Sequence, residues 1–212
     1  MLSRSGRPFA TWLFRPFVKA AVALHVSANQ ATVVGSVLSA SAAIGLLATD
    51  HLALGAWVVT FLVIFDSLDG QIARATNTTS SFGAFLDATM DRMVDGTIFG
   101  SLIVWSLRYG DPRFEMWTVV CGIAALTFAL TTSYAKARAE AQGLSANVGW
   151  IERTDRLVVL LLTAFLTGVG AGDHWIMDGM VFLAAAGFVT VVQRMRHVYR
   201  QFVARESPGQ GR

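Results

Sequence analysis

Long apolar stretches separated by short polar turns dominate this chain. They cover roughly residues 30–49, 53–75, 82–107, 114–141, 154–172 and 176–200. Each is about as long as the roughly 20 residues that an α-helix needs to cross the hydrocarbon core of a bilayer. The turns contain helix-breaking residues, such as Pro112 and Gly170. The pattern predicts an all-α integral membrane protein with six transmembrane helices.

The N-terminal segment has a different pattern, in which basic side chains alternate with aromatic and aliphatic ones. Arg4, Arg7, Arg15 and Lys19 lie among Phe, Trp and Leu residues. A secretory signal would instead have one basic end followed by an unbroken apolar core. The interleaved pattern is typical of an amphipathic helix that lies at the membrane surface. We therefore expect an interfacial helix before the six spans, within a single membrane domain that covers residues 1–212.

The basic residues predict the orientation in the membrane. If the N-terminus is cytoplasmic, only Arg108 and Arg113 of the 17 Lys and Arg residues fall on the outer side. Loops on the cytoplasmic side of membrane proteins carry the excess of positive charge. We therefore expect a multi-pass protein of the cell membrane with both termini in the cytoplasm.

Composition supports the membrane assignment and excludes some chemistry. Charged residues make up 15% of the chain and hydrophobic residues 54%, whereas soluble domains usually carry about 25% charged residues. The net charge is only +3, and it is not gathered into the basic stripe expected of a nucleic-acid binder. Cys121 is the one cysteine, which excludes an internal disulfide and a cysteine-based metal site.

Four aspartates stand where the second and third apolar runs meet. Asp66 and Asp69 are three residues apart, and Asp87 and Asp91 are four apart. On helices, each spacing puts the two side chains on one face. Because a short turn joins the two runs, we expect all four carboxylates to converge on the cytoplasmic side.

Divalent cations explain such a cluster best. Neighbouring carboxylates repel one another, and a buried unpaired charge costs several kcal/mol. An all-oxygen ligand set suits Mg²⁺, Mn²⁺ or Ca²⁺ rather than Zn²⁺. Four carboxylates match two divalent ions, a pairing used in phosphoryl transfer. The alternative is a purely structural role, in which the helices pack together and the aspartates pair with Arg74 and Arg92. Two arginines, however, cannot neutralise four acids. Asp95 lies outside the pattern and is interpreted as structural.

The spacing Asp-x2-Asp-Gly-x2-Ala-Arg-x8-Gly-x3-Asp-x3-Asp, complete at residues 66–91, resembles the signature of the CDP-alcohol phosphotransferase family. The resemblance implies that an alcohol attacks a CDP-linked lipid and that CMP leaves. It implies a homodimer and two Mg²⁺ ions, with Mn²⁺ also possible. It makes Asp66, Asp69, Asp87 and Asp91 the metal ligands, and makes Asp91 also the general base.

The same resemblance predicts a binding site for the CDP-lipid. Arg74 is placed for a phosphate oxygen, and Gly70 and Ala73 clear room beside the metals. Before the first span, the family carries Asn-x-x-Thr; from the residues alone, Asn29 could equally be a helix N-cap. The predicted residues of this site are Asn29, Gln30, Ala31, Thr32, Gly70, Ala73, Arg74 and Ser80.

Two further motifs point to the acceptor alcohol. Ser-Tyr-x-Lys-Ala-Arg-Ala-Glu-Ala-x-Gly stands at Ser133–Gly143, and Glu-Arg-x-x-Arg at Glu152–Arg156. They resemble one branch of the family, the phosphatidylinositol phosphate synthases of actinobacteria, which implies inositol 1-phosphate as acceptor. The acceptor phosphate would be held by Ser133, Lys136, Arg156 and Arg196. A phosphatidylglycerophosphate synthase, which uses glycerol 3-phosphate, would need the same cations and is the alternative.

Two non-enzymatic interpretations compete with this one. Acidic residues inside a membrane can mark the path of a divalent-cation transporter, but the outer halves of these apolar runs are nearly all aliphatic. A structural membrane protein that recruits partners through its basic face would leave the pattern of Asp66 to Asp91 unexplained.

Overall fold

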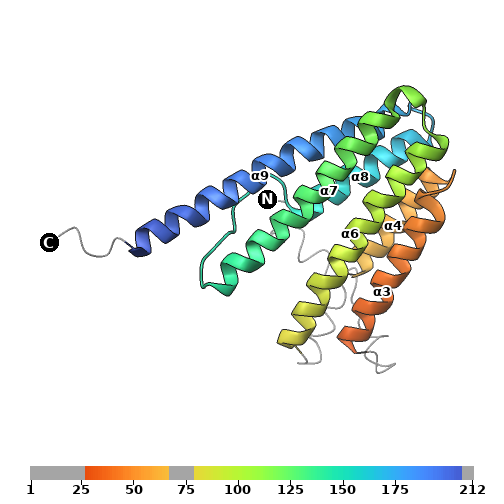
Figure 1. The fold of residues 1–212 in the computed structure, drawn as a ribbon. Coiled ribbons are helices and arrows are strands. Elements are labelled where there is room, and N and C mark those ends of the chain that lie inside the picture. The colour runs from red at the N-terminus through yellow and green to blue at the C-terminus, as the bar shows by residue number, and fades with distance from the viewer. Residues whose placement is uncertain (1–26, 67–78, 207–212) are drawn as a thin grey trace.

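The structure is a computed structural model that describes residues 27–66 and 79–206. Every regular element in these residues is a helix (Figure 1). The all-α prediction is confirmed. The elements are α3 (Ala28–Ala42), the π-helical turn η1 (Ala43–Leu47), α4 (Leu52–Asp66), α6 (Ser81–Tyr109), α7 (Pro112–Ala141), α8 (Arg153–Gly168) and α9 (His174–Glu206).

The described helices follow the apolar runs of the sequence closely. Helix α3 continues into η1, so the described residues form six helical rods, each overlapping one predicted run. Three rods are long and apolar enough to cross a membrane: Ala28–Leu47, Pro112–Ala141 and His174–Glu206. Helix α4 is apolar but shorter. The predicted interfacial helix and the end of the second run, residues 67–75, lie outside the described residues.

Close helix contacts build the core of the bundle. Helix α7 runs along α9, α3 packs against both α4 and α6, and α8 packs against α4 and α9 (Figure 1). Small residues allow this: a Cβ atom added at Gly187 of α9 would lie 2.9 Å from Cβ of Phe128 on α7. Small residues at helix interfaces are typical of membrane proteins, where backbones approach closely. Phe99 and Leu102 of α6 lie at the centre of the core and are completely buried.

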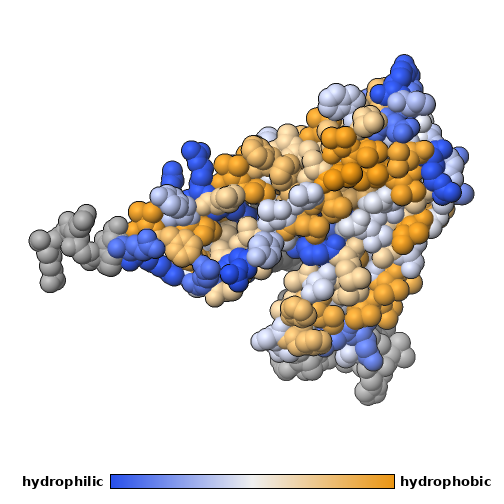
Figure 2. All heavy atoms as spheres, viewed as in Figure 1, coloured by the Kyte–Doolittle hydropathy of each residue, from blue (hydrophilic) through white to orange (hydrophobic). Residues whose placement is uncertain are grey.

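The outside of the bundle is apolar along the length of the rods. Trp57, Met116, Trp117 and Phe188 are all more than half exposed. In Figure 2 the apolar surface covers much of the bundle, and hydrophilic residues gather toward its ends. An apolar exterior of this extent would be unfavourable in water and suits contact with lipid acyl chains.

The first described helix begins differently from the residue-based interpretation. Asn29 was a candidate N-cap, but the cap of α3 is Ser27, whose hydroxyl accepts a hydrogen bond from the backbone N–H of Gln30. The Gln30 side chain in turn accepts from the Ser27 N–H at 2.9 Å, which completes a capping box. The N-cap interpretation of Asn29 is therefore wrong. Because Ser27 already caps the helix, the Asn29 side chain is not needed for capping.

Candidate active site

The residues predicted for the CDP-lipid meet at the start of α6. Ser80 caps this helix by accepting a hydrogen bond from the Gly83 N–H at 2.9 Å. A Cβ atom added at Gly83 would lie 3.1 Å from Oδ1 of Asn29 and 3.2 Å from Oγ of Ser80. Two predicted residues, separated by about 50 positions in the chain, thus lie on either side of one glycine. Thr32 is buried one turn further along α3, and Gln30 and Ala31 lie in the first turn.

Two of the four predicted metal ligands have described side chains. Asp87 and Asp91 are half-buried and one helical turn apart on α6. Asp66 is the last residue of α4, but its side chain lies outside the described part, as do Asp69, Gly70, Ala73 and Arg74. Nothing in the described residues therefore tests the full four-carboxylate cluster.

The Asp91 carboxylate contacts two arginine side chains. Its Oδ1 lies 2.9 Å from Nη1 of Arg153, at the start of α8, and its Oδ2 lies 3.5 Å from Nη2 of Arg92. Charge-assisted contacts of this length fix the orientation of a carboxylate. The two arginines come from different helices, so the folded bundle, rather than α6 alone, positions Asp91.

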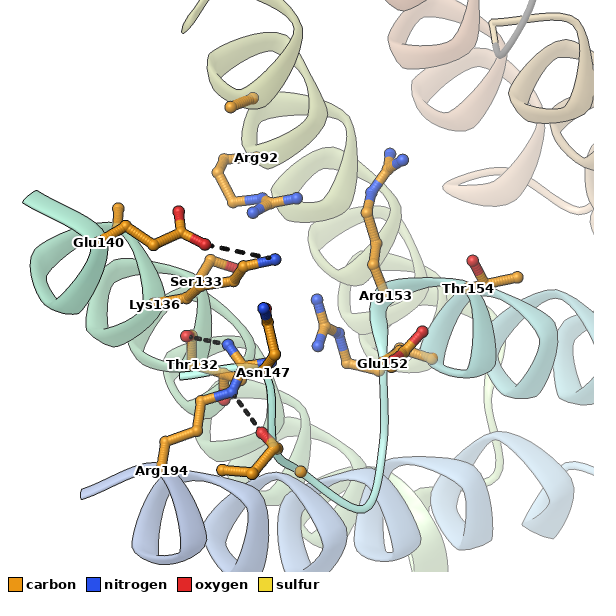
Figure 3. A pocket seen from close by; sticks show the side chains of 15 residues that line it. Arg92, Thr132, Ser133, Lys136, Glu140, Asn147, Glu152, Arg153, Thr154 and Arg194 are labelled. Atoms are coloured by element: carbon orange, nitrogen blue, oxygen red, sulfur yellow. Dashed lines mark hydrogen bonds and ion pairs between the residues drawn. The ribbon is translucent and has the colours of Figure 1, made fainter. Parts of the chain in front are cut away.

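A cavity of about 590 Å³ opens beside Asp91, between α6, α7, α8 and α9. Figure 3 shows Arg92 on α6 and Lys136 on α7 pointing into it, while the Arg153 side chain extends toward α6. Glu140 and Glu152 are the acidic residues of its lining. Five basic side chains line it, namely Arg92, Lys136, Arg153, Arg156 and Arg194.

Three of the four predicted acceptor residues line this cavity. They are Ser133, Lys136 and Arg156. The Lys136 ammonium lies 3.8 Å from Oε1 of Glu140. Arg196 is exposed on α9 and is not among the lining residues, so its assignment to the acceptor site stays a prediction.

Arg194 lies in the cavity instead of Arg196. Its Nε donates to the Val148 carbonyl at 2.9 Å, and its Nη1 donates to the Thr132 carbonyl at 2.6 Å. These bonds tie the connection between α7 and α8 to both α7 and α9 (Figure 3). Two residues along a helix correspond to roughly 200° of rotation, so Arg194 and Arg196 leave α9 in nearly opposite directions.

Arg92 and Arg153 are cavity residues that sequence reasoning missed. A signal for Arg153 was present, because Arg153 and Arg156 share a face in the first turn of α8. Cations are disfavoured at a helix N-terminus, where the macrodipole is positive. Two arginines at that position indicate a nearby negative group that compensates them.

The fold and the site define a membrane-embedded phosphotransferase, and the comparisons with known proteins agree. The family model of CDP-alcohol phosphatidyltransferase matches residues 25–192. The chain therefore belongs to the CDP-alcohol phosphatidyltransferase family, and the resemblance read from the aspartate motif is confirmed.

Curated relatives narrow this to one branch of the family. The chain is 39% identical over 196 residues to a phosphatidylinositol phosphate synthase of Mycobacteroides abscessus, covering 92% of this chain and 84% of the relative. It is 36% identical over 206 residues to a protein of the same name from Corynebacterium glutamicum, covering 97% and 93% of the two chains. Both relatives belong to the actinobacterial phosphatidylinositol phosphate synthases, the branch that the acceptor motifs resemble.

Solved structures show the same arrangement of helices. The structure resembles the phosphatidylinositol phosphate synthase of Mycobacterium tuberculosis in complex with manganese and citrate, with a TM-score of 0.81 at 35% identity, covering 87% of this chain and 88% of the other. The same enzyme with CDP-DAG bound gives a TM-score of 0.80 at 34% identity, covering 87% and 92%.

Proposed function

We propose that this protein is a phosphatidylinositol phosphate synthase, which transfers the phosphatidyl group of CDP-diacylglycerol to inositol 1-phosphate and releases CMP. The observation that carries the proposal is the cavity lined by five basic side chains, one of which, Arg153, contacts Asp91. The lining has five basic residues and two acidic ones, and an alcohol without a phosphate would add no negative charge to balance that excess. A phosphorylated polyol places an anion among them and a hydroxyl group near Asp91.

Divalent ions suit the aspartates of this chain. The donor atoms on α6 are carboxylate oxygens one turn apart, and α4 ends on another aspartate, an oxygen-only set that suits Mg²⁺ or Mn²⁺. The manganese in the mycobacterial structure supports the same choice. Bound by Asp66, Asp69, Asp87 and Asp91, two such ions would neutralise the pyrophosphate of the CDP-lipid.

Other residues of the chain would bind the two substrates and transfer the proton. Asn29 and Ser80, which flank Gly83, would bind the CDP part together with Arg74. Lys136 and Arg156 would hold the acceptor phosphate. Asp91 would take the proton of the acceptor hydroxyl, whose oxygen then bonds to the phosphorus next to diacylglycerol. The bond from that phosphorus to the bridging oxygen of the pyrophosphate breaks, and CMP leaves with the electron pair.

We also propose how the protein lies in the membrane. The six rods would all span it as a single domain over residues 1–212, with the amphipathic helix of the N-terminal segment at the surface. The termini and the active site would face the cytoplasm, where the basic residues gather. A homodimer is the assembly that the family resemblance implies.

Release of CMP by the purified protein tests the proposed function. With CDP-diacylglycerol and Mg²⁺, we expect CMP to appear when inositol 1-phosphate is added and not when unphosphorylated inositol is added. Release with glycerol 3-phosphate alone would overturn the choice of acceptor and favour a phosphatidylglycerophosphate synthase. No release with any alcohol would contradict the enzymatic function and return the cation transporter to consideration.

A further inference from the structure

Asp95 is a buried acid that the metal motif does not include. It lies on α6 one turn beyond Asp91, and its side chain is only 3% exposed. Three guanidinium groups from two helices surround it. Arg153 Nε donates to Oδ1 at 3.0 Å, while Arg92 Nε and Arg156 Nη2 lie 3.7 Å and 3.6 Å from Oδ2. All three arginines also line the cavity, whereas Asp95 lies behind it.

The three arginines need this carboxylate in order to stay together. Arg156 is nearly as buried as Asp95, and a buried charge without a partner is strongly unfavourable. Arg153 and Arg156 also occupy the first turn of α8, where the helix macrodipole disfavours cations. Removing the negative charge of Asp95 would leave three positive charges close together with only Asp91 beside them, and they would separate or draw in solvent.

The contacts to Asp95 differ in a way that suits ligand binding. Only Arg153 is fixed by a hydrogen bond, because the distances of Arg92 and Arg156 from Oδ2 exceed hydrogen-bond length. Arg92 Nε and Asp95 Oδ2 are buried and have no hydrogen-bond partner in the part of the chain that the structure describes. Arg92 and Arg156 are thus held near Asp95 by charge, while their N–H groups keep donor capacity for an anion in the cavity.

Arg153 joins this cluster to the proposed general base. One guanidinium contacts both acids, through Nε to Oδ1 of Asp95 and through Nη1 to Oδ1 of Asp91. Asp95 thereby fixes the distance between the cationic cavity and Asp91. The acceptor needs that distance to be constant, since its phosphate and its reacting hydroxyl belong to one molecule.

We propose that Asp95 is a positioning residue for the acceptor, which holds Arg92, Arg153 and Arg156 in the geometry that binds the acceptor phosphate beside Asp91. The inference rests on the proposed function, because it assigns a phosphorylated acceptor to the cavity. An acid that only stabilised the fold would affect both substrates and the thermal stability alike.

The test compares Asp95→Asn, Asp95→Glu and the wild type as purified full chains. We expect Asp95→Asn to raise the KM for the phosphorylated acceptor about tenfold or more, with the KM for CDP-diacylglycerol changed less than about twofold. Asp95→Glu, which restores the charge, should recover part of the acceptor KM. Asp178→Asn, the same change at an exposed position near the start of α9, is the matched control. An unchanged acceptor KM in Asp95→Asn, or equal rises for both substrates, would overturn the proposal.

A second pair of variants covers the case in which Asp95→Asn does not fold. Arg92→Gln combined with Asp95→Asn removes one positive charge along with the negative one. We expect this double variant to have a higher acceptor KM than Arg92→Gln alone, because Arg153 has lost its hydrogen bond to Oδ1. Equal values in the two proteins would contradict a positioning role.

Binding of inorganic phosphate separates this inference from the proposed function. Titration calorimetry of the purified protein with phosphate requires no turnover. We expect Asp95→Asn to weaken phosphate binding by a factor similar to the rise in acceptor KM. If the wild type releases no CMP with inositol 1-phosphate, the proposed acceptor fails, yet loss of phosphate binding in Asp95→Asn would still support the positioning role. Equal phosphate affinity in the two proteins would overturn that role whatever the acceptor.

Discussion

At the residue scale, two features of Asp91 bear on its proposed role in catalysis. It belongs to the predicted metal ligands, and it contacts Arg153 and Arg92 at the edge of the cavity. An unperturbed Asp is a weak base at neutral pH. The role of Asp91 in proton transfer therefore depends on its position more than on its basicity.

Asp91→Asn tests this residue directly. The amide has nearly the same shape but can neither accept the proton nor carry the ligand charge, so we expect kcat to fall by roughly 10²-fold or more. The measurement is CMP release at saturating concentrations of both substrates. Asp178→Asn serves as the control and should retain wild-type kcat. An Asp91→Asn protein with kcat within a few-fold of wild type would remove Asp91 from the chemical step.

Arg156→Ala tests the acceptor site. We expect the acceptor KM to rise about tenfold or more, because a charge-assisted contact to the phosphate is lost, while the KM for CDP-diacylglycerol stays the same. Arg196→Ala tests the second acceptor residue, which the resemblance assigns to the acceptor phosphate but which does not line the cavity. Since Arg196 is exposed on α9, we expect a smaller rise. Equal rises for the two variants would show that Arg196 also reaches the acceptor.

At the scale of helices, the packing of α4 against α8 depends on Gly168. A Cβ atom added there would lie 2.8 Å from Cβ of Leu52 and 2.9 Å from Cα of Ala53. The second contact is to backbone, which cannot rotate away. Small residues permit this approach, so α4 and α8 must separate if a methyl group is added.

Gly168→Ala should therefore destabilise the protein by about 1–3 kcal/mol, the usual cost of overpacking, and lower its unfolding temperature in detergent. Gly100→Ala is the matched control, because no described atom outside its own helix lies within 4 Å of the added Cβ. That variant should be neutral or slightly more stable, since Ala favours a helix over Gly by about 1 kcal/mol. Equal unfolding temperatures for the two variants would contradict the close contact between α4 and α8.

The helices could be predicted from the sequence because each apolar run is a local signal. The run at 154–172 became α8, which ends at Gly168, and Gly170 and Gly172 follow with positive φ angles of 84° and 122°. The cap of α3 was not predicted, because Ser27 and Asn29 are both good capping residues. The structure shows that Ser27 caps the helix.

In the site, too, features set by one helix could be predicted, and contacts between helices could not. Asp87 and Asp91 follow from spacing on one helix. Whether Arg194 or Arg196 lines the cavity depends on which face of α9 meets α7. The apolar pattern of a long membrane helix does not determine that face. The contacts of Asp95 depend on α8 arriving beside α6, although the two are separated by about 60 residues in the chain.

At the scale of the whole molecule, charge is distributed unequally between the two ends of the bundle. The end that carries the cavity holds Arg92, Lys136, Arg153, Arg156 and Arg194. The end where α6 turns into α7 holds Arg108 and Arg113, and Arg113 is paired with Asp111. The more basic end of a membrane protein usually lies in the cytoplasm, so this distribution of charge favours the proposed orientation.

Labelling of single cysteines tests this orientation. In a Cys121→Ala background, Asp50→Cys places a thiol in the exposed turn between η1 and α4, and Gln142→Cys places one in the exposed connection after α7. A membrane-impermeant maleimide should label Asp50→Cys in intact cells and should label Gln142→Cys only after permeabilisation. The cysteine-free parent should stay unlabelled in both conditions. The reverse pattern would place the cavity outside the cell and would contradict the proposed orientation. Labelling of both positions in intact cells would mean that the chain between them does not cross the membrane as proposed.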